Sequence, residues 1–436
     1  MTGFGARSGA YFSMAGSGSS ITTPAEKHTN PKPNVLQGSY TKWFPWGAGN
    51  TYPQDTVKLI PKTTVLPRAF NHLIKKIYGK GIVPSHVQID SNGNKKYTPT
   101  KDPAILDFFK SNNIRRFMLE TITDYVWFGN AFPEVILNKR RTKIVKIFPN
   151  EASYCRWQLI NEKSNIVENC YVSANWGNPA DDEIKTVAAL DMYDPQTALY
   201  DGNAYKYILD TSFPSPDKYY YQQPVWDGEG MRNWMAIAIE VPIMKLAEYV
   251  NAANIQWHVE IPLDYWTNVF SKMSPQPTEA EKKKYIDEEL DNMDNFLCGS
   301  KNAKKMFISH FGTDPITKKE LPGWKITALN RNEADGKHTI DSSAANSEML
   351  FAAGVDPAEI GAGMPGGPYT QSSGGSNKRE AYLISTATIQ PDRDALTEWA
   401  YIIRDFNKWD TSVEFPIIDS VLTTLDQGSG TQKTLG

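Results

Sequence analysis

The sequence is poor in the residues that build disulfide frameworks and metal centres. Its 436 residues include 3 cysteines and 6 histidines. The cysteines, Cys155, Cys170 and Cys298, are too few and too scattered for a disulfide framework or a CxxC metal site. The histidines show no metal-ligand spacing. We therefore expect a reducing compartment and no bound metal.

Long hydrophobic runs are also missing. The most apolar stretch, 234–246, is interrupted by Glu240 and Lys245 before it is long enough to cross a bilayer. No cationic segment precedes an apolar one at the N-terminus, so neither a secretion signal nor a membrane partner is expected. The net charge is only −3, from 46 basic and 49 acidic residues, which gives the whole chain no general attraction to phosphate backbones. Any contact with nucleic acid must then be local.

The motifs of common nucleotide-binding and hydrolytic enzymes are absent. The sequence contains no P-loop of the GxxxxGKS or GxxxxGKT type, and no GxSxG or HExxH pattern. Residues 361–366 match GxGxxG, but they follow a predicted helix, include Pro365 and lack an acidic partner about 20 positions on. We expect no cofactor and no catalytic residue, and predict that the protein is not an enzyme.

Aromatic residues, by contrast, are plentiful at 12%, with 12 tryptophans, and such rings suit large interfaces. Residues 1–49 are expected to form a flexible arm, because most of this segment is rich in Gly, Ser, Thr and Pro and low in apolar residues. Trp43, Phe44 and Trp46 stand near its end. These rings either cap the core of their own chain or anchor a neighbouring subunit.

Hydrophobic periodicity outlines the remaining elements. Helices are predicted over 63–80, 103–127, 231–259, 278–297, 342–353 and 376–409, the last kinked or divided at Pro391. Strands are predicted at 87–89, 96–97, 131–137, 144–148, 306–311 and 324–329, with short strands and loops over 150–225. Gly129 is expected to end its helix in the left-handed conformation. The basic turn 139–143 could meet phosphates, but it is equally typical of a solvated hairpin end.

The predicted helix 278–297 has the strongest charge pattern. It opens with Thr278 and Glu281, which match a capping box. Its apolar residues form one stripe and leave a broad acidic face. The acidic candidates are Glu281, Asp287, Glu288, Glu289, Asp291 and Asp294. Carboxylates in this pattern are more typical of a wet helix face than of an acid–base pair.

Several weak motifs occur in an informative order. Residues 128–135, FGNAFPEV, join a helix to a strand, and a hairpin closes on 144–149. Residues 353–361, AGVDPAEIG, end the helix before a Gly-rich loop. The final helix begins with SNKRE at 376–380 and is broken by IQP at 389–391.

In this order the motifs resemble those of portal proteins of tailed double-stranded-DNA bacteriophages, over roughly residues 60–410. That family has a GNAY-like step, where Phe132 here replaces Tyr, and a GVPP-like segment, where Asp356 here replaces the first Pro. The loop through Gly375 is longer than the common form, and the SNxE-like start of the final helix is one residue longer. Each motif is degenerate, and their shared order carries the resemblance.

The resemblance implies an α+β, phage-portal-like subunit with a wing, a helical stem, a clip and a C-terminal helical region. Such subunits assemble as a ring, typically a dodecamer, at one capsid vertex. Double-stranded DNA would pass through it without sequence recognition during packaging and ejection. The implied partners are the major capsid protein, the terminase large subunit, which supplies the work, and a head–tail adaptor. The implied location is the portal vertex of the virion, and the host cytoplasm during assembly.

The same resemblance divides the chain and assigns candidate surfaces. It implies an arm at 1–49, a wing at 50–230, a stem helix at 231–259, a clip at 260–277, a second stem helix at 278–297, a wing return with a tunnel-facing segment at 298–375, and a C-terminal helical wing or crown at 376–436. The acidic face of the second stem helix would line the channel and repel phosphates. Cations at a constriction would contact the DNA backbone, unless they only balance neighbouring acids. The cationic candidates are Lys301, Lys304, Lys305, Arg331 and Lys337. Trp43, Phe44 and Trp46 would clasp neighbouring subunits.

Two other functions remain open at this point. Another phage head or adaptor protein would also be a ring component, but it would not need two long stem helices. A metal-dependent nucleic-acid enzyme would need an acidic site assembled from distant parts of the sequence. Divalent-metal-dependent nicking, lost on mutation of particular carboxylates, would indicate the enzyme.

Overall fold

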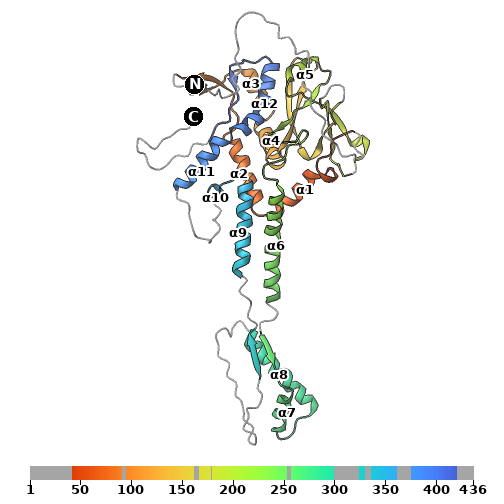
Figure 1. Cartoon of the computed structure of the whole chain (residues 1–436), viewed down its shortest axis with the longest axis vertical. Coiled ribbons are helices and arrows are strands. Elements are labelled where there is room, and N and C mark those ends of the chain that lie inside the picture. Colours follow the sequence, from red (N-terminus) through yellow and green to blue (C-terminus); the bar gives the residue numbers. More distant parts are fainter. Residues whose placement is uncertain are drawn as a thin grey trace, which may run out of the picture.

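The computed structural model describes the chain from residue 42 to residue 419 with seven internal gaps. The described ranges are 42–90, 95–161, 166–177, 179–252, 257–298, 324–328, 335–360 and 375–419. The predicted arm therefore lies almost entirely outside the described residues. The chain mixes helices and strands, as the α+β prediction requires. Figure 1 shows an elongated molecule with a head, a pair of helices below it, and a small module at the opposite end.

The head is built around a seven-stranded sheet. The strand order is β4-β3-β8-β7-β6-β5, and β9 also pairs with β3. The strands are β3 (Asn130–Leu137), β4 (Ile144–Asn150), β5 (Cys155–Trp157), β6 (Asn169–Val172), β7 (Lys185–Ala189), β8 (Lys206–Ile208) and β9 (Thr211–Ser212). All pairs are antiparallel except β7 with β8. The central β3 is almost wholly buried, because strands flank it on both sides and α4 packs against it.

Helices and a smaller sheet complete the head. The helices are α1 (Tyr52–Leu59), α2 (Leu66–Tyr78), α3 (Pro103–Ser111), α4 (Ile114–Phe128), α5 (Pro195–Asp201) and α12 (Gln390–Phe406). Short 3-10 turns lie at Ala48–Asn50, Ile60–Lys62, Ala152–Tyr154 and Asp181–Glu183. The smaller sheet has the order β12-β1-β2, with β1 (Ser85–Ile89), β2 (Lys95–Pro99) and β12 (Val413–Glu414). Trp399 of α12 is fully buried with its ring edge-on to Phe117, at a centroid distance of 5.2 Å, so the C-terminal helix is part of the core.

The predicted helix 103–127 is two helices. The chain breaks between α3 and α4, where Asn113 has a φ of 46° and starts a new helix from the left-handed region. The side chain of Asn112 leaves the helix and reaches β4 instead, where its Oδ1 accepts from the backbone N–H of Ile147. Gly129 ends α4 with a φ of 69°, as predicted. A Cβ at Gly129 would lie 3.0 Å from the backbone nitrogen of Pro224, so a larger residue has no room there.

Two long helices extend from the head. They are α6 (Glu229–Ala252) and α9 (Asp335–Ala352), which pack side by side (Figure 1). Helix α6 continues through Pro242 and ends before 259, because β10 begins at Trp257. The chain then returns through α10 (Pro357–Ile360) and α11 (Gly375–Thr388) to α12. The division of α11 from α12 falls just before Pro391, as predicted.

A small module, residues 257–298 and 324–328, is called the distal module below. It contains β10 (Trp257–Glu260), α7 (Leu263–Ser271), α8 (Glu279–Cys298) and β11 (Lys325–Ala328). The two strands are antiparallel, and Lys325 forms an ion pair of 2.7 Å with Glu260 across them. The predicted strand 306–311 lies outside the described residues.

The structure shows which long helices pack together. The family resemblance implied stem helices at 231–259 and 278–297. In the structure α9 lies along α6, whereas α8 packs on α7 of the distal module. The reason lies in the apolar stripe of α8, because Tyr285 meets the rings of Trp266 and Phe270 of α7. Helix α7 was not predicted.

Candidate functional site

The distal module is held together by aromatic rings. Trp266 of α7 is the centre of the cluster, with ring centroids 5.1 Å from Tyr265 and 5.8 Å from Trp324. Tyr285 of α8 closes the other side, 5.9 Å from the ring of Phe270. Edge-on contacts of this kind give a small module a defined shape where it has little aliphatic core.

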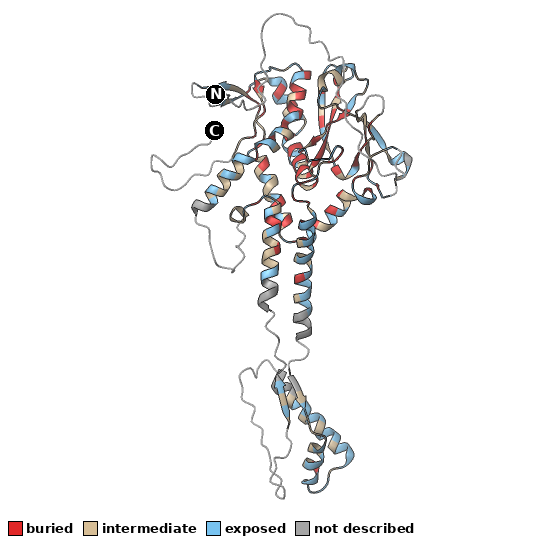
Figure 2. Ribbon diagram, viewed as in Figure 1, coloured by how far each residue is buried: buried red, intermediate tan, exposed pale blue. Residues whose placement is uncertain are grey.

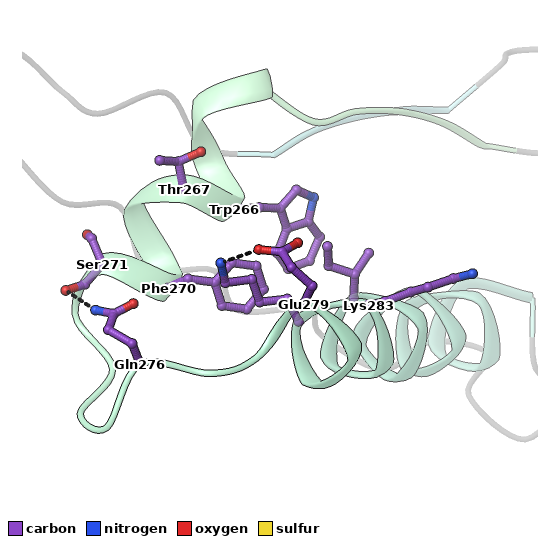
Figure 3. Close-up of a pocket in the computed structure, with 9 residues that line it drawn as sticks. Trp266, Thr267, Phe270, Ser271, Gln276, Glu279 and Lys283 are labelled. Atoms are coloured by element: carbon purple, nitrogen blue, oxygen red, sulfur yellow. Dashed lines mark hydrogen bonds and ion pairs between the residues drawn. The ribbon is translucent and has the colours of Figure 1, made fainter.

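A cavity of about 570 Å³ opens beside this cluster, in the volume range of ligand pockets. Its lining residues are Trp266, Thr267, Phe270, Ser271, Gln276, Glu279, Lys282, Lys283 and Ile286. Figure 3 shows the rings of Trp266 and Phe270 beside the side chain of Glu279. Glu279 forms an ion pair of 2.7 Å with Lys282. Its lining thus combines aromatic rings with polar side chains and one ion pair.

Glu281 has a structural role that the sequence predicted in part. Its carboxylate accepts from the backbone N–H of Thr278 at 2.8 Å, and its own N–H donates to the Thr278 hydroxyl at 3.4 Å. The N–H and hydroxyl of Thr278 lower the pKa of Glu281, which is fully exposed. The capping box is therefore confirmed. Glu281 therefore fixes the start of α8.

The other acidic candidates belong to the distal module. Asp287, Glu288 and Asp291 are exposed, and Glu289 is half-buried. Glu288 lies 3.6 Å from Lys284, one turn earlier. The side chain of Asp294 is outside the described part of the chain. The acidic row thus exists on the surface of α8, below the pair of long helices rather than within it (Figure 1).

The cationic candidates are not brought together by the described structure. Lys301, Lys304, Lys305 and Arg331 lie outside the described residues. Lys337 lies in the first turn of α9, and its side chain is likewise not described.

The aromatic candidates near the N-terminus act within their own chain. Trp46 is 5% exposed and stacks on Tyr221 at 4.4 Å. Phe44 stacks on Tyr220 at 4.1 Å, and Trp43 packs edge-on against Trp176. The cap over the core is thus the interpretation that the structure supports, and Trp46 in particular has no free face for a neighbouring subunit.

The sequence predicted an apolar stripe on the helix 231–259, including Ile243 and Leu246, but not its exposure. Helix α6 exposes Ile237, Ile243, Met244 and Leu246, with Ile243 at 57% and Leu246 at 64%. Figure 2 shows exposed positions along much of this helix. Helices that are apolar on all sides are normally covered by protein or lipid. The signal was present in the sequence, because 234–246 is its most apolar stretch, but exposure cannot be seen without the structure.

Helix α9 has a matching stripe. Ile340, Ala344, Ser347 and Phe351 recur at intervals of three and four residues, so they share one face. Ile340 is 68% exposed and Phe351 is 84% exposed. The buried Met349 lies on a different face, which packs into the core. Exposed apolar side chains therefore lie on both long helices, Ile237, Ile243, Met244 and Leu246 on α6 and Ile340 and Phe351 on α9.

The described residues contain no group of three or more His, Cys, Asp or Glu side chains placed to hold a metal ion. None of the described helices is long and apolar enough to cross a membrane.

Comparisons with known proteins give the fold. No family model matches the sequence, and no curated protein matches it. A chain in the neck of an empty gene transfer agent (GTA) particle with C6 symmetry is 14% identical over 87% of both chains, with a TM-score of 0.55. A chain in the virion of a native GTA particle is 13% identical over 87% of this chain and 86% of that one, with a TM-score of 0.56. A looser match, with a TM-score of 0.31, is an HK97-family phage portal protein from Corynebacterium diphtheriae, 12% identical over 80% of this chain and 89% of that one.

The first two matches cover most of both chains at a TM-score above 0.5. The chain therefore shares the fold of a chain found in these particles. The family resemblance predicted from the sequence is confirmed at this level.

Proposed function

We propose that the chain is the subunit of a ring-shaped channel at one vertex of a phage-type capsid, through which double-stranded DNA is packaged and ejected. The observation that carries the proposal is the pair of apolar faces on α6 and α9. The GTA necks that share the fold are described with C6 and C12 symmetry, which is compatible with a ring of identical subunits. In this chain the ring would cover the exposed apolar faces.

The two faces suit a contact between unlike surfaces. If α6 of one copy packs on α9 of the next, each copy offers one face on either side, and the contact repeats until the ring closes. Ala344 and Ser347 are small and allow the close approach of a neighbouring helix, while Phe351 and Ile340 project beside them. The ring would thus have a wall of alternating α6 and α9 helices.

The remaining parts take the following roles in the proposal. The head forms the wing, α6 and α9 form the stem, and the distal module forms the clip. This assignment replaces 278–297 by α9 as the second stem helix and extends the clip to α8. The tunnel-facing segment expected within 298–375 falls largely on residues outside the described ranges.

The distal module would then be the part that meets other components. Its cavity offers Trp266 and Phe270 as a floor for an apolar anchor, such as one from the terminase or the head–tail adaptor. The acidic row on α8, repeated in every copy, would form an annular field that repels phosphates and lets DNA slide. The proposed role is structural and needs no catalytic group.

Substitution of the α6 face tests the proposal. We expect Ile243→Asp with Met244→Asp to leave the monomer folded, because both side chains are exposed, and to abolish rings. Tyr193→Asp is the matched control, because Tyr193 is 93% exposed and lies on the head. Particle mass and electron microscopy give the copy number, and circular dichroism confirms the helical content. Rings of unchanged size in the double variant would contradict the proposed stem contact.

A second structural role, that of another head or adaptor protein, predicts rings as well. The discriminating observation is a central hole wide enough for duplex DNA, with the long helices arranged around it.

A further inference from the structure

Three segments of the chain meet at one rim of the head. These are the end of α3, the turn between β3 and β4, and the residues after α12. The ammonium of Lys146 donates to the carbonyl of Ser111 at 3.0 Å, which ties β4 to the end of α3. The Asn407 side chain accepts from the N–H of Ile144 at 2.7 Å and donates to its carbonyl at 2.9 Å, which ties β4 to the end of α12. Figure 1 places α3 at the end of the head far from the distal module.

Side chains already form hydrogen bonds with the backbone at the outer edge of β4. Strand β4 is the last strand of the large sheet, so its outer edge would be open to pairing with another strand. Asn407 occupies this edge at Ile144, and Asn112 occupies it at Ile147. The rim therefore offers side chains, rather than backbone groups, to a partner.

Those side chains are cationic. The exposed basic residues are Lys110, Arg115, Lys139, Arg140, Lys143 and Lys408. Within the described part of the chain none of the six has an ion-pair partner. We call this set the cationic rim.

Three charged neighbours of the rim, Arg141, Asp405 and Asp410, make contacts of their own. Arg141 donates to the carbonyls of Leu199 at 3.0 Å and Ala204 at 3.2 Å, so it fixes the turn on which Lys139, Arg140 and Lys143 stand. The carboxylates that flank Lys408 in sequence are also occupied. Asp405 pairs with Arg404 at 2.7 Å, and Asp410 accepts from the backbone N–H of Ser412 at 2.9 Å.

We propose that the cationic rim binds the phosphate backbone of duplex DNA outside the channel, without reading the base sequence. Unpaired lysine and arginine side chains on a fixed support match a polymer that carries one negative charge per about 1.7 Å of its axis. Contacts of this kind position a duplex but do not specify its sequence. The choice of DNA rests on the proposed function, in which the head of every copy lies close to packaged DNA, and the ring multiplies each charge by its copy number.

Two rim residues, Lys110 and Lys408, have positions that helix stability alone would explain, so the test must distinguish this role from DNA binding. Lys110 lies in the last turn of α3, and Lys408 follows the end of α12. Cations at such places stabilise helices through the helix dipole. Lys139, Arg140 and Lys143 lie on a turn, where this explanation does not apply, so the experiment changes these three.

The experiment uses the full chain and measures binding to 30-base-pair duplexes of two unrelated sequences over a range of salt concentrations. The variant is Lys139→Glu with Arg140→Glu and Lys143→Glu. The matched control carries the same charge change at Lys58, Lys62 and Lys218, which are exposed elsewhere on the head. We expect the rim variant to lose about tenfold or more in affinity at low salt for both sequences. Its salt slope should fall by about two to three, as each lost phosphate contact contributes about 0.9.

Three results would overturn the proposal. The first is DNA binding by the rim variant that equals that of the wild type. The second is an equal loss of DNA binding in the control variant. The third is a rim variant that loses binding to polyglutamate but still binds DNA, which would indicate an acidic protein partner. Particle mass is measured on the same samples. Rings with unchanged DNA binding in the rim variant would overturn this inference alone, whereas the absence of rings from the wild type would count against the proposed function and leave the binding comparison valid.

Discussion

Lys76 and Glu359 join two parts of the chain that lie far apart in sequence. The ammonium of Lys76 is 2.8 Å from Oε2 of Glu359, whose side chain is 3% exposed. His72 contacts the same carboxylate, and the hydroxyl of Ser385 donates to its other oxygen. One buried carboxylate thus holds α10 between α2 of the head and α11, close to the upper end of α9.

This junction predicts a loss of stability in acid. Burial alone would raise the pKa of Glu359, but hydrogen bonds from His72, Lys76 and Ser385 outweigh it and lower the pKa to about 2. A carboxyl with a lowered pKa stabilises the folded state above its unfolded value near 4.5, and this contribution disappears as the pH falls toward 2. We expect Glu359→Gln to remove up to about 3 kcal/mol at neutral pH. Unfolding free energies at pH 3 and pH 6 check this, and parallel pH profiles for variant and wild type would contradict it.

Asp124 predicts the opposite pH dependence. It is buried in α4 and accepts from the N–H of Ala152 at 2.8 Å. Burial raises its pKa to about 8 and outweighs that hydrogen bond. Because the folded state holds a proton that the unfolded state releases, this group costs stability as the pH rises from 4 to 8. Asp124→Asn should keep the acceptor and abolish that slope. A variant that is strongly destabilised at every pH would contradict the assignment.

Arg156 is expected to resist even conservative replacement. It is fully buried, and its guanidinium lies 5.5 Å from the ring centre of Trp46 and 5.0 Å from that of Trp176. It also donates to Oδ1 of Asn50 at 2.6 Å and to the Asn50 carbonyl at 2.8 Å. Lysine cannot make these planar contacts and would leave buried acceptors unpaired, so Arg156→Lys should cost about 2–4 kcal/mol. Urea unfolding measures it, with the exposed Arg140→Lys as a control that should behave as wild type.

The acidic row of α8 predicts a defect in packaging rather than in assembly. Glu288→Lys with Glu289→Lys would turn repulsion of phosphates into attraction in every copy of the ring. We expect rings to form in normal numbers and the DNA packaged per particle to fall. Glu288→Gln with Glu289→Gln should have a smaller effect, because it removes charge without reversing it. Normal packaging in the lysine variant would remove the proposed role of this row.

Most helices and strands could be predicted because their apolar side chains recur at clear helical or strand spacings. The helix 278–297 matches α8 within one residue, and the hairpin 131–148 matches β3 and β4. The spacing of apolar residues does not show which helix packs on which. Both α8 and α9 could have lain beside α6 on sequence grounds, and the aromatic contacts that draw Tyr285 to Trp266 of α7 depend on a helix too short to give a periodic signal.

The candidate surfaces were predicted less well than the elements. Charge runs are visible in a sequence, so the acidic row and the basic turn 139–143 were found. The apolar face of α6 was not, because the hydrophobicity of 234–246 is equally typical of a buried core helix. Ile243 and Met244 become informative only when the structure leaves them exposed in a single chain.

The most direct test of the central claim is a single-particle reconstruction of the purified full-length chain, with its particle mass. The account predicts closed rings near twelve copies, with a hole wide enough for duplex DNA and with Ile243, Met244 and Phe351 buried between α6 of one copy and α9 of the next. A stable monomer or dimer that keeps these side chains exposed, or a ring whose copies touch through other faces, would contradict it.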